Sequence, residues 1–287
     1  MYNKVELNDI EVLVKMPANY SEGNSYPVFI GFSGGDQTTE TVAYSAKVYF
    51  SSSYFQDHIQ IVPINTNLKN FKDYSAQEIE IFIKAIMTLY ATTTSNWAIA
   101  GTSNGGKATF NFVAQNPKLF KNVVTFPGGL FNIIPNESWS HLNIVLANGK
   151  KDGYSWILES KASYEKLLDK VNKIELMVVS GQKHIFSEDY QIDQIYSKLF
   201  EENNDSFLLE MAIAKNPNSP NAGSLKKVAP GMENQQKNKK PIEQVEDKVA
   251  VIIEETIAER KIDLKMDGET MKNDDKKQQQ SLSKTVN

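Results

Sequence analysis

The chain of 287 residues contains no cysteine, only three histidines and a single arginine, Arg260. The absence of cysteine excludes disulfides, thiol nucleophiles and thiolate metal sites, and three histidines argue against a histidine-rich metal centre. Without an arginine before residue 260, no guanidinium is available there to hold a carboxylate or phosphate through two parallel hydrogen bonds. We therefore expect a neutral substrate rather than an anionic one, with lysine as the remaining source of a positive point charge.

The chain also lacks a strong charge of one sign and a long apolar run. Lys and Arg number 31 against 35 Asp and Glu, which gives a net charge of −4 and no basic surface for nucleic acid. No apolar run reaches the roughly 18 residues that a membrane span needs. The N-terminal residues do not follow the basic-then-apolar layout of a signal peptide, so we expect a cytoplasmic protein, with an already processed secreted form as the alternative.

Composition divides the chain near residue 203. Residues 1–203 hold 17 lysines, 21 acidic residues and nearly all the aromatics, whereas residues 204–287 hold 14 basic residues, 14 acidic residues and one aromatic, Phe207. A segment so poor in apolar residues buries too little surface to offset the entropy cost of ordering. We therefore expect a domain over residues 1–203, followed by a low-complexity charged tail over residues 204–287 that is largely disordered.

One part of the tail has a helical pattern. Its apolar residues recur on one stripe, and they are Ile242, Val245, Val249, Ile252, Ile253 and Ile257. This spacing predicts an amphipathic helix within residues 242–264. An exposed apolar helix face usually packs on something, so a protein partner for this helix is one expectation.

Short apolar runs alternate with helical patterns over residues 1–203. The N-terminal residues 5–14 read as a pair of extended strands, and later β-rich runs lie at residues 28–30, 59–62, 97–100, 123–126, 144–146 and 176–179. Most of these runs are continuously apolar, which is typical of strands buried on both faces of a parallel sheet. The alternation predicts an α/β domain with helices on both faces and with its reacting residues beyond the carboxyl ends of the strands.

The most specific motif is Gly101-Thr102-Ser103-Asn104-Gly105-Gly106, which follows a predicted strand and precedes a predicted helix. A tight strand-to-helix turn forces the central residue into strained backbone angles and exposes its hydroxyl above the sheet. Cβ atoms two residues on either side would collide, which explains glycine at positions 101 and 105. The motif predicts Ser103 as a nucleophile; a serine-capped turn without chemistry is the alternative interpretation.

A serine nucleophile needs a base and an orienting acid after later strands. Asp152 follows the predicted strand at residues 144–146, and His184 follows the strand at residues 176–179. The remaining histidines, His58 and His141, precede their strands, which places them at the wrong end of the sheet. We therefore predict Ser103, Asp152 and His184 as the catalytic residues, although Asp152 alone or His184 alone would be an ordinary turn or surface residue.

Acyl transfer also needs hydrogen-bond donors for the developing oxyanion. The amide of Asn104, directly after the nucleophile, is one expected donor. The loop Gly31-Phe32-Ser33-Gly34-Gly35-Asp36 follows the strand at residues 28–30, and its glycines allow a close backbone approach. We predict the Gly34 amide as the second donor and Ser33 as the next choice.

These motifs resemble the α/β-hydrolase superfamily of serine hydrolases over residues 25–201, particularly its small esterase, dienelactone-hydrolase-like and prolyl-oligopeptidase-like branches. The matching pieces are Gly34-Gly35, Gly101-Thr102-Ser103-Asn104-Gly105-Gly106, Gly149-Lys150-Lys151-Asp152 and Gly181-Gln182-Lys183-His184. The resemblance implies an α/β-hydrolase fold with a mostly parallel central sheet, a Ser-Asp-His triad, an acyl-enzyme intermediate, and no metal or organic cofactor. Many members carry His-Gly where this chain has Phe32-Ser33, which leaves the identity of the oxyanion donor open.

The expected substrates are small-molecule esters that carry small or sugar-linked acyl groups, because a site without a lid suits soluble esters, acylated sugars or peptide ends better than interfacial lipid. Only residues 127–143 connect the predicted strand at residues 123–126 to the strand at residues 144–146, which Asp152 follows, so no lid domain fits between them. Four aromatic residues flank the expected pocket as candidate substrate contacts, although ordinary loop packing is the favoured explanation for any one of them: Phe131, Trp139, Tyr154 and Trp156.

Two other functions fit the same residues. A peptidase or amidase would use the same triad and acyl-enzyme chemistry, so the sequence does not separate it from an esterase. A non-catalytic binding protein on a hydrolase fold is an alternative of a different class, and a complete triad argues against it.

Overall fold

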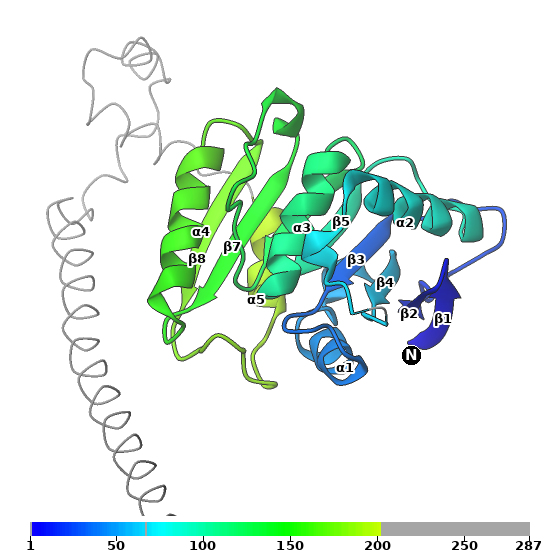
Figure 1. Ribbon diagram of the computed structural model, residues 1–287, viewed down its shortest axis with the longest axis horizontal. Coiled ribbons are helices and arrows are strands. Elements are labelled where there is room, and N and C mark those ends of the chain that lie inside the picture. Colours follow the sequence, from blue (N-terminus) through cyan, green and yellow to red (C-terminus); the bar gives the residue numbers. More distant parts are fainter. Residues whose placement is uncertain (1, 67, 202–287) are drawn as a thin grey trace, which may run out of the picture. The chain divides into compact units, whose positions relative to one another are not determined.

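The computed structural model describes residues 2–66 and 68–201, whose backbone forms an eight-stranded sheet flanked by helices (Figure 1). The strands are β1 (Asn3–Leu7), β2 (Ile10–Lys15), β3 (Val28–Phe32), β4 (Ile59–Pro63), β5 (Trp97–Gly101), β6 (Phe120–Thr125), β7 (Asn143–Gly149) and β8 (Lys173–Val179). Their order across the sheet is β1-β2-β4-β3-β5-β6-β7-β8. Strands β1 and β2 pair antiparallel, and β3 to β8 run parallel to one another. The predicted α/β class and mostly parallel sheet are confirmed.

Helices cover both faces of the sheet, as predicted (Figure 1). The α-helices are α1 (Thr39–Val48), α2 (Ala76–Leu89), α3 (Asn104–Gln115), α4 (Tyr154–Leu167) and α5 (Asp193–Tyr196). The 3₁₀ turns are η1 (Ser53–Phe55), η2 (Phe71–Asp73), η3 (Glu137–Trp139) and η4 (Ser197–Leu199). Helices α2, α3 and α4 contribute to the hydrophobic cluster on one face, whereas α1 and α5 contribute to the cluster on the other.

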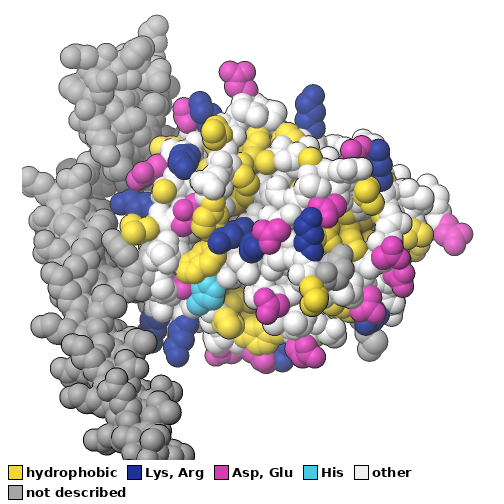
Figure 2. Space-filling view, viewed as in Figure 1, with side chains coloured by type: hydrophobic (Ala, Val, Ile, Leu, Met, Phe, Trp, Pro, Cys, Tyr) yellow, Lys and Arg dark blue, Asp and Glu magenta, His cyan; other side chains and the backbone are white. Residues whose placement is uncertain are grey.

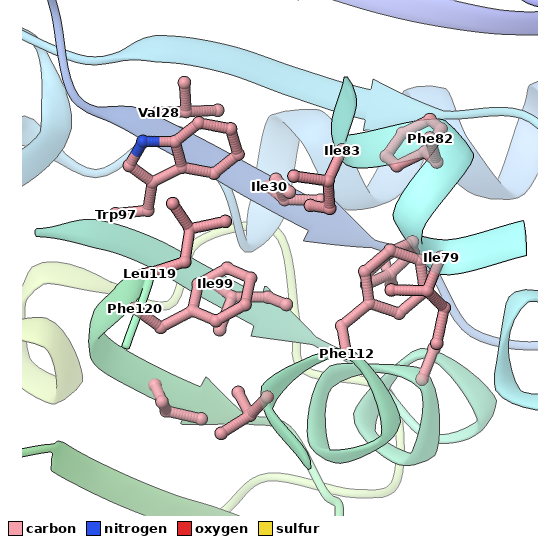
Figure 3. Close-up of a cluster of buried hydrophobic side chains, with 14 of the residues drawn as sticks. Val28, Ile30, Ile79, Phe82, Ile83, Trp97, Ile99, Phe112, Leu119 and Phe120 are labelled. Atoms are coloured by element: carbon pink, nitrogen blue, oxygen red, sulfur yellow. The ribbon is translucent and has the colours of Figure 1, made fainter. Parts of the chain in front are cut away.

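The burial of the strands follows their hydrophobic patterns. Strand β2 alternates buried and half-buried residues, while β3, β4 and β5 are buried at every position. The continuous burial places the central strands between two helical layers, as continuously apolar runs predict. Figure 3 shows the cluster on the α2 and α3 side, where side chains from β3 and β5 meet those of the two helices; its labelled members are Val28, Ile30, Ile79, Phe82, Ile83, Trp97, Ile99, Phe112, Leu119 and Phe120.

Helix α2 begins at a capping box. The Ser75 hydroxyl accepts a hydrogen bond from the Glu78 amide, and the Glu78 carboxylate accepts one from the Ser75 amide. These two bonds satisfy amide groups that the first helical turn leaves unpaired. The apolar face of the helix, which includes Ile79 and Phe82, then packs on the sheet.

The last helical segment of the described chain is short. Residues 193–199 form the four-residue helix α5 followed by the 3₁₀ turn η4. Apolar residues three apart fit a 3₁₀ turn as well as an α-helix, so the spacing alone did not separate the two. Between β6 and β7 the described chain contains only the short η3, and no lid domain is inserted there, as expected.

No helix among residues 2–66 and 68–201 is long and apolar enough to cross a membrane. The predicted tail over residues 204–287 and its helix within residues 242–264 lie outside the described residues.

Candidate active site

The predicted site residues lie in loops at the carboxyl ends of neighbouring parallel strands (Figure 1). Gly34 follows β3, Ser103 follows β5, Asp152 follows β7 and His184 follows β8. Parallel strands end at the same edge of a sheet, so loops distant in sequence meet there. His58 and His141 instead precede β4 and β7, at the opposite edge.

Ser103 occupies the sharp turn between β5 and α3. Its backbone angles are φ +54° and ψ −113°, a strained combination for a residue with a side chain, costing about 1–3 kcal/mol. The surrounding chain holds the turn, because the Ser103 amide donates to the Pro127 carbonyl at 2.9 Å and the Gly105 amide donates to the Thr102 carbonyl at 2.7 Å.

Both glycines of the turn are required by close backbone contacts. A Cβ atom on Gly101 would lie 2.1 Å from the Gly105 carbonyl oxygen, and one on Gly105 would lie 2.1 Å from the Phe32 carbonyl oxygen. The second contact joins the Ser103 turn to the loop after β3. The predicted collision at positions 101 and 105 therefore has identifiable partners in the structure.

The loops after β7 and β8 are joined by backbone contacts. The Lys150 amide donates to the Val179 carbonyl at 2.9 Å, and the Lys151 amide donates to the Gln182 carbonyl at 2.8 Å. A Cβ atom on Gly149 would lie 2.2 Å from the Lys183 carbonyl oxygen, so the two loops approach too closely there for any side chain. This packing brings the residues that follow in each loop into contact.

Asp152 and His184 form a hydrogen bond across these loops. Nδ1 of His184 donates to Oδ1 of Asp152 at 2.9 Å, and the Gly153 amide donates to the same oxygen at 2.5 Å. The Asp152 side chain is 1% exposed, whereas the His184 side chain is 37% exposed. A buried carboxylate thus orients an accessible imidazole, the arrangement in which the second ring nitrogen is free to accept a proton from a substrate or nucleophile.

Ser103 and His184 line the same cavity, which has a volume of about 570 Å³. Within the described chain no hydrogen bond joins the Ser103 hydroxyl to His184; such contacts often tighten only when substrate binds. Other walls of the cavity come from α1 and from the loops after β6 and β8, and include Tyr44, Tyr49, Phe126 and Ile185. The aromatic and aliphatic walls make this a pocket for an apolar group next to the serine.

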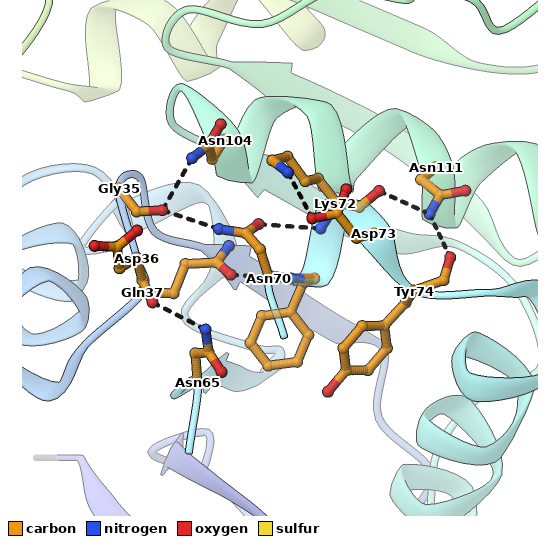
Figure 4. Close-up of polar contacts among 11 residues, drawn as sticks. Gly35, Asp36, Gln37, Asn65, Asn70, Lys72, Asp73, Tyr74, Asn104 and Asn111 are labelled. Atoms are coloured by element: carbon orange, nitrogen blue, oxygen red, sulfur yellow. Dashed lines mark hydrogen bonds and ion pairs between the residues drawn. The ribbon is translucent and has the colours of Figure 1, made fainter. Parts of the chain in front are cut away.

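The loop after β3 lies directly against the Ser103 turn. A Cβ atom on Gly34 would be 3.3 Å from Cβ of Ser103. The side chain of Asn104 donates to the Gly35 carbonyl at 3.1 Å, and the side chain of Asn70 donates to the same oxygen at 2.9 Å, as Figure 4 shows. These bonds fix the loop relative to the first turn of α3.

Gln37 holds the same loop from inside. Its side chain donates to the Ser33 carbonyl at 3.1 Å and accepts from the Phe71 amide at 3.0 Å. The amides of Gly34 and Asn104 make no hydrogen bond within the described residues, so both are available to a ligand. Two such amides beside Ser103 can bind an oxyanion.

The four aromatic residues that were predicted to contact substrate lie in different parts of the structure. The Trp156 ring lies 5.3 Å from the His184 ring, and the Phe131 ring lies 5.9 Å from that of Trp156, between ring centroids. Trp139 is buried in the core, stacked on Phe110, and does not reach the cavity. Tyr154 begins α4, and its side chain is outside what the structure describes.

Sequence reasoning missed two residues beside these rings. The Lys107 ammonium lies 4.3 Å from the centre of the Phe131 ring and 5.3 Å from that of Trp156. The Glu159 carboxylate accepts a hydrogen bond from the Phe131 amide at 2.7 Å. The position of Lys107 near the start of α3, directly after the Ser103 turn, was the available signal.

The other two histidines have structural partners. Nδ1 of His58 lies 2.5 Å from a carboxylate oxygen of Asp57, and burial lowers the pKa of His58 below its ordinary value. Nε2 of His141 donates to the carbonyls of Pro117 and Phe120. Neither lies in the loops that carry Ser103 and His184.

Residues 7–213 match the model of the family Esterase, which is described as "Putative esterase". No curated protein matches the chain in sequence.

Several solved structures are similar to this chain at low sequence identity. A ferulic acid esterase is 13% identical with a TM-score of 0.51, and the match covers 70% of this chain and 96% of that one. Esterase 2 of Thermogutta terrifontis is 15% identical with a TM-score of 0.49, over 73% of this chain and 92% of that one. A thermostable esterase is 16% identical with a TM-score of 0.48, over 73% of this chain, which spans only 62% of that protein's length.

Proposed function

The chain belongs to the esterase family and is a carboxylesterase-type hydrolase, and we propose that Ser103, Asp152 and His184 form its catalytic triad. The observation that carries this proposal is the hydrogen bond of 2.9 Å from His184 to the buried Asp152, with His184 lining the same cavity as Ser103. The sharp turn at Ser103 supports the role of its hydroxyl as the nucleophile.

In the proposed mechanism, His184 takes the Ser103 proton as the hydroxyl oxygen attacks the ester carbonyl carbon. Asp152 holds the imidazole in the required tautomer and stabilises the imidazolium that forms. The amides of Asn104 and Gly34 bind the oxyanion, because they lie beside Ser103 and have no partner in the described chain. Collapse of the tetrahedral intermediate breaks the bond to the alcohol oxygen, which receives the proton from His184.

The acyl-enzyme is then hydrolysed by water. His184 accepts a proton from the water as its oxygen attacks the acyl carbon, and the proton returns to the Ser103 oxygen when the carboxylic acid leaves. All of these steps use groups of this chain and water.

We assign the acyl group to the cavity of about 570 Å³ beside Ser103. Its walls include aromatic and aliphatic side chains, among them Tyr44, Phe126 and Ile185, which favours short or medium apolar acyl groups. Esters of small or sugar-linked acyl groups are the substrates that we propose.

A panel of short-chain aryl esters tests this function. The wild-type chain should hydrolyse acetyl and butyryl esters, and Ser103→Ala should remove the activity while circular dichroism shows an unchanged fold. The matched control is Ser187→Ala, an exposed serine in the loop after β8, which should keep wild-type activity. Full activity of the Ser103→Ala variant would contradict the proposed nucleophile.

A further inference from the structure

A second cavity, of about 530 Å³, lies next to the rings beside His184. Lys107 and Phe131 line it, and both contact Trp156, whose ring in turn contacts His184. Asn111 and Lys72 also line it. This cavity does not share a lining residue with the cavity that Ser103 lines.

The two lysines that line this second cavity, Lys72 and Lys107, differ in their ion-pair partners. The Lys72 ammonium lies 2.5 Å from the Asp73 carboxylate, so its charge is compensated. The Lys107 ammonium lies over the Phe131 and Trp156 rings and forms no salt bridge within the described residues. Ring faces attract a cation but leave its charge uncompensated, so an anion brought to Lys107 gains an ion pair without displacing one.

Phe131, whose ring contacts the Lys107 ammonium, has an unfavourable backbone conformation. Phe131 has φ +51°, in the left-handed region that a bulky residue rarely adopts. Its amide donates to Glu159, and the Leu130 amide donates to Ser163 at 2.8 Å, so helix α4 anchors this turn with two side chains. Oε1 of the Glu159 carboxylate accepts both from the Phe131 amide and from the Ser163 hydroxyl, and no salt bridge joins Glu159 to Lys107 within the described residues. Strained backbone held in this way is typical of functional positions.

In the proposed mechanism, the alcohol part of the ester lies toward Trp156 and Lys107. The alcohol oxygen receives its proton from His184 and must therefore lie beside that imidazole. Trp156 contacts the His184 ring, so the alcohol part extends along Trp156 and toward Lys107. The acyl part occupies the cavity beside Ser103.

We propose that the alcohol part of the substrate carries a carboxylate or another anionic group, which Lys107 binds while Trp156 and Phe131 contact the ring or chain next to it. This assignment rests on the proposed function and refines its substrate class. It also changes the expectation of a neutral substrate, because a lysine placed over two aromatic rings supplies the positive charge that arginine does not. Figure 2 shows, on one face of the molecule, a histidine bordered by hydrophobic side chains with lysine and acidic side chains beside them.

Two aryl acetates that differ in one charge test the proposal: 4-acetoxybenzoate, which is anionic, and its neutral methyl ester. Their intrinsic reactivities differ, but this difference cancels when the ratio of their kcat/KM values is compared between variants. The chains compared are wild type, Lys107→Met, Lys107→Arg and, as a control of equal net charge, Lys84→Met. Lys84 is exposed on α2 and pairs with Glu80.

We expect Lys107→Met to lower the ratio of anionic to neutral kcat/KM by about five-fold, as for a partly exposed ion pair of about 1 kcal/mol. Lys107→Arg and Lys84→Met should keep the wild-type ratio, and salt at about 0.5 M should lower that ratio in the wild type by screening. An unchanged ratio in Lys107→Met, including an equal fall of kcat/KM for both esters, would overturn this proposal. The proposed function would still stand in that case if ester hydrolysis depends on Ser103. Failure of the wild type to hydrolyse either ester would overturn both.

Discussion

The imidazole of His184 donates a hydrogen bond to the carboxylate of Asp152 at 2.9 Å, although 32 residues separate the two in the chain. Both residues lie in loops that follow adjacent parallel strands, β7 and β8, and those loops are joined by backbone hydrogen bonds. The contact is therefore a product of the sheet order rather than of local sequence. His184, oriented by this bond, lines the same cavity as Ser103.

Asp152→Asn tests the orienting role of the carboxylate. An amide can donate to Nδ1 and so favours the wrong imidazole tautomer, and we expect kcat for short-chain esters to fall by about 10⁴-fold. Steady-state kinetics measure this fall, with Asp169→Asn as the control because the exposed Asp169 pairs, within the described residues, with its neighbour Lys170. A near-wild-type rate in Asp152→Asn would mean that another group orients His184.

Gly105→Ala tests the backbone contact between the Ser103 turn and the loop after β3. The added Cβ atom would meet the Phe32 carbonyl oxygen at 2.1 Å, so one of the two segments must move. We expect a loss of about 3 kcal/mol in the free energy of unfolding, as for an overpacked core position. Urea denaturation measures it.

The matched control for Gly105→Ala is Gly153→Ala. Gly153 has φ −59°, and the nearest atom to an added Cβ is 3.8 Å away on Trp156, so alanine fits there without strain. Equal stability losses in the two variants would show that the short distance at Gly105 is not what destabilises the chain.

Glu78→Gln tests the capping box of α2 through its pH dependence. Hydrogen bonds from Lys69, then from Ser75, lower the pKa of the Glu78 carboxyl from 4.5 to about 2. Because the folded-state pKa is depressed, the stabilisation is fully present above pH 4.5 and is lost as the pH falls toward 2. We therefore expect wild type to be more stable than Glu78→Gln at pH 7, with the difference shrinking as the pH falls from 4.5 to 2.

Denaturation curves at several pH values measure this difference. Glu22→Gln is the control, because the exposed Glu22 side chain makes no hydrogen bond or salt bridge in the described chain. Its stability should match that of the wild type at each pH. A difference between wild type and Glu78→Gln that stays constant down to pH 2 would contradict the assigned pKa shift.

A chain shortened to end at Asn216 tests the proposed division near residue 203. The family match ends at residue 213, and the proposed triad is complete at His184, so we expect cooperative unfolding and full esterase activity. Loss of activity without loss of helical circular dichroism would instead assign the residues after 216 to the substrate site. If adding a peptide that covers residues 242–264 then restored the activity of the shortened chain, the loss would be assigned to that segment.

Much of the site could be predicted because it depends on backbone rules. A strand, a tight glycine-flanked turn and a helix identify Ser103, and the rule that sites lie at the carboxyl ends of parallel strands leads to Asp152 and His184. These rules depend only on local sequence and on the order of the elements. They could not establish the distance between Asp152 and His184, which the loop contacts at Gly149 determine.

The residues that line the site were harder to predict because their places depend on tertiary packing. Trp139 is close in sequence to the loops of the site, but it precedes β7 and packs in the core near the amino ends of the strands. Lys107 was not predicted, since its contact with Phe131 requires a left-handed backbone angle at Phe131 and an anchor at Glu159. Neither requirement is visible in composition or periodicity.

The most direct test of the central claim is to locate the covalent adduct of a fluorophosphonate probe on the intact chain. An activated serine attacks the phosphorus and releases fluoride, so the adduct marks the nucleophile. We predict a single adduct, found by peptide mass spectrometry on the peptide that contains Ser103, and none in the Ser103→Ala variant. No labelling of the folded wild type, or equal labelling of Ser103→Ala at another residue, would contradict the assignment of Ser103 as the catalytic serine.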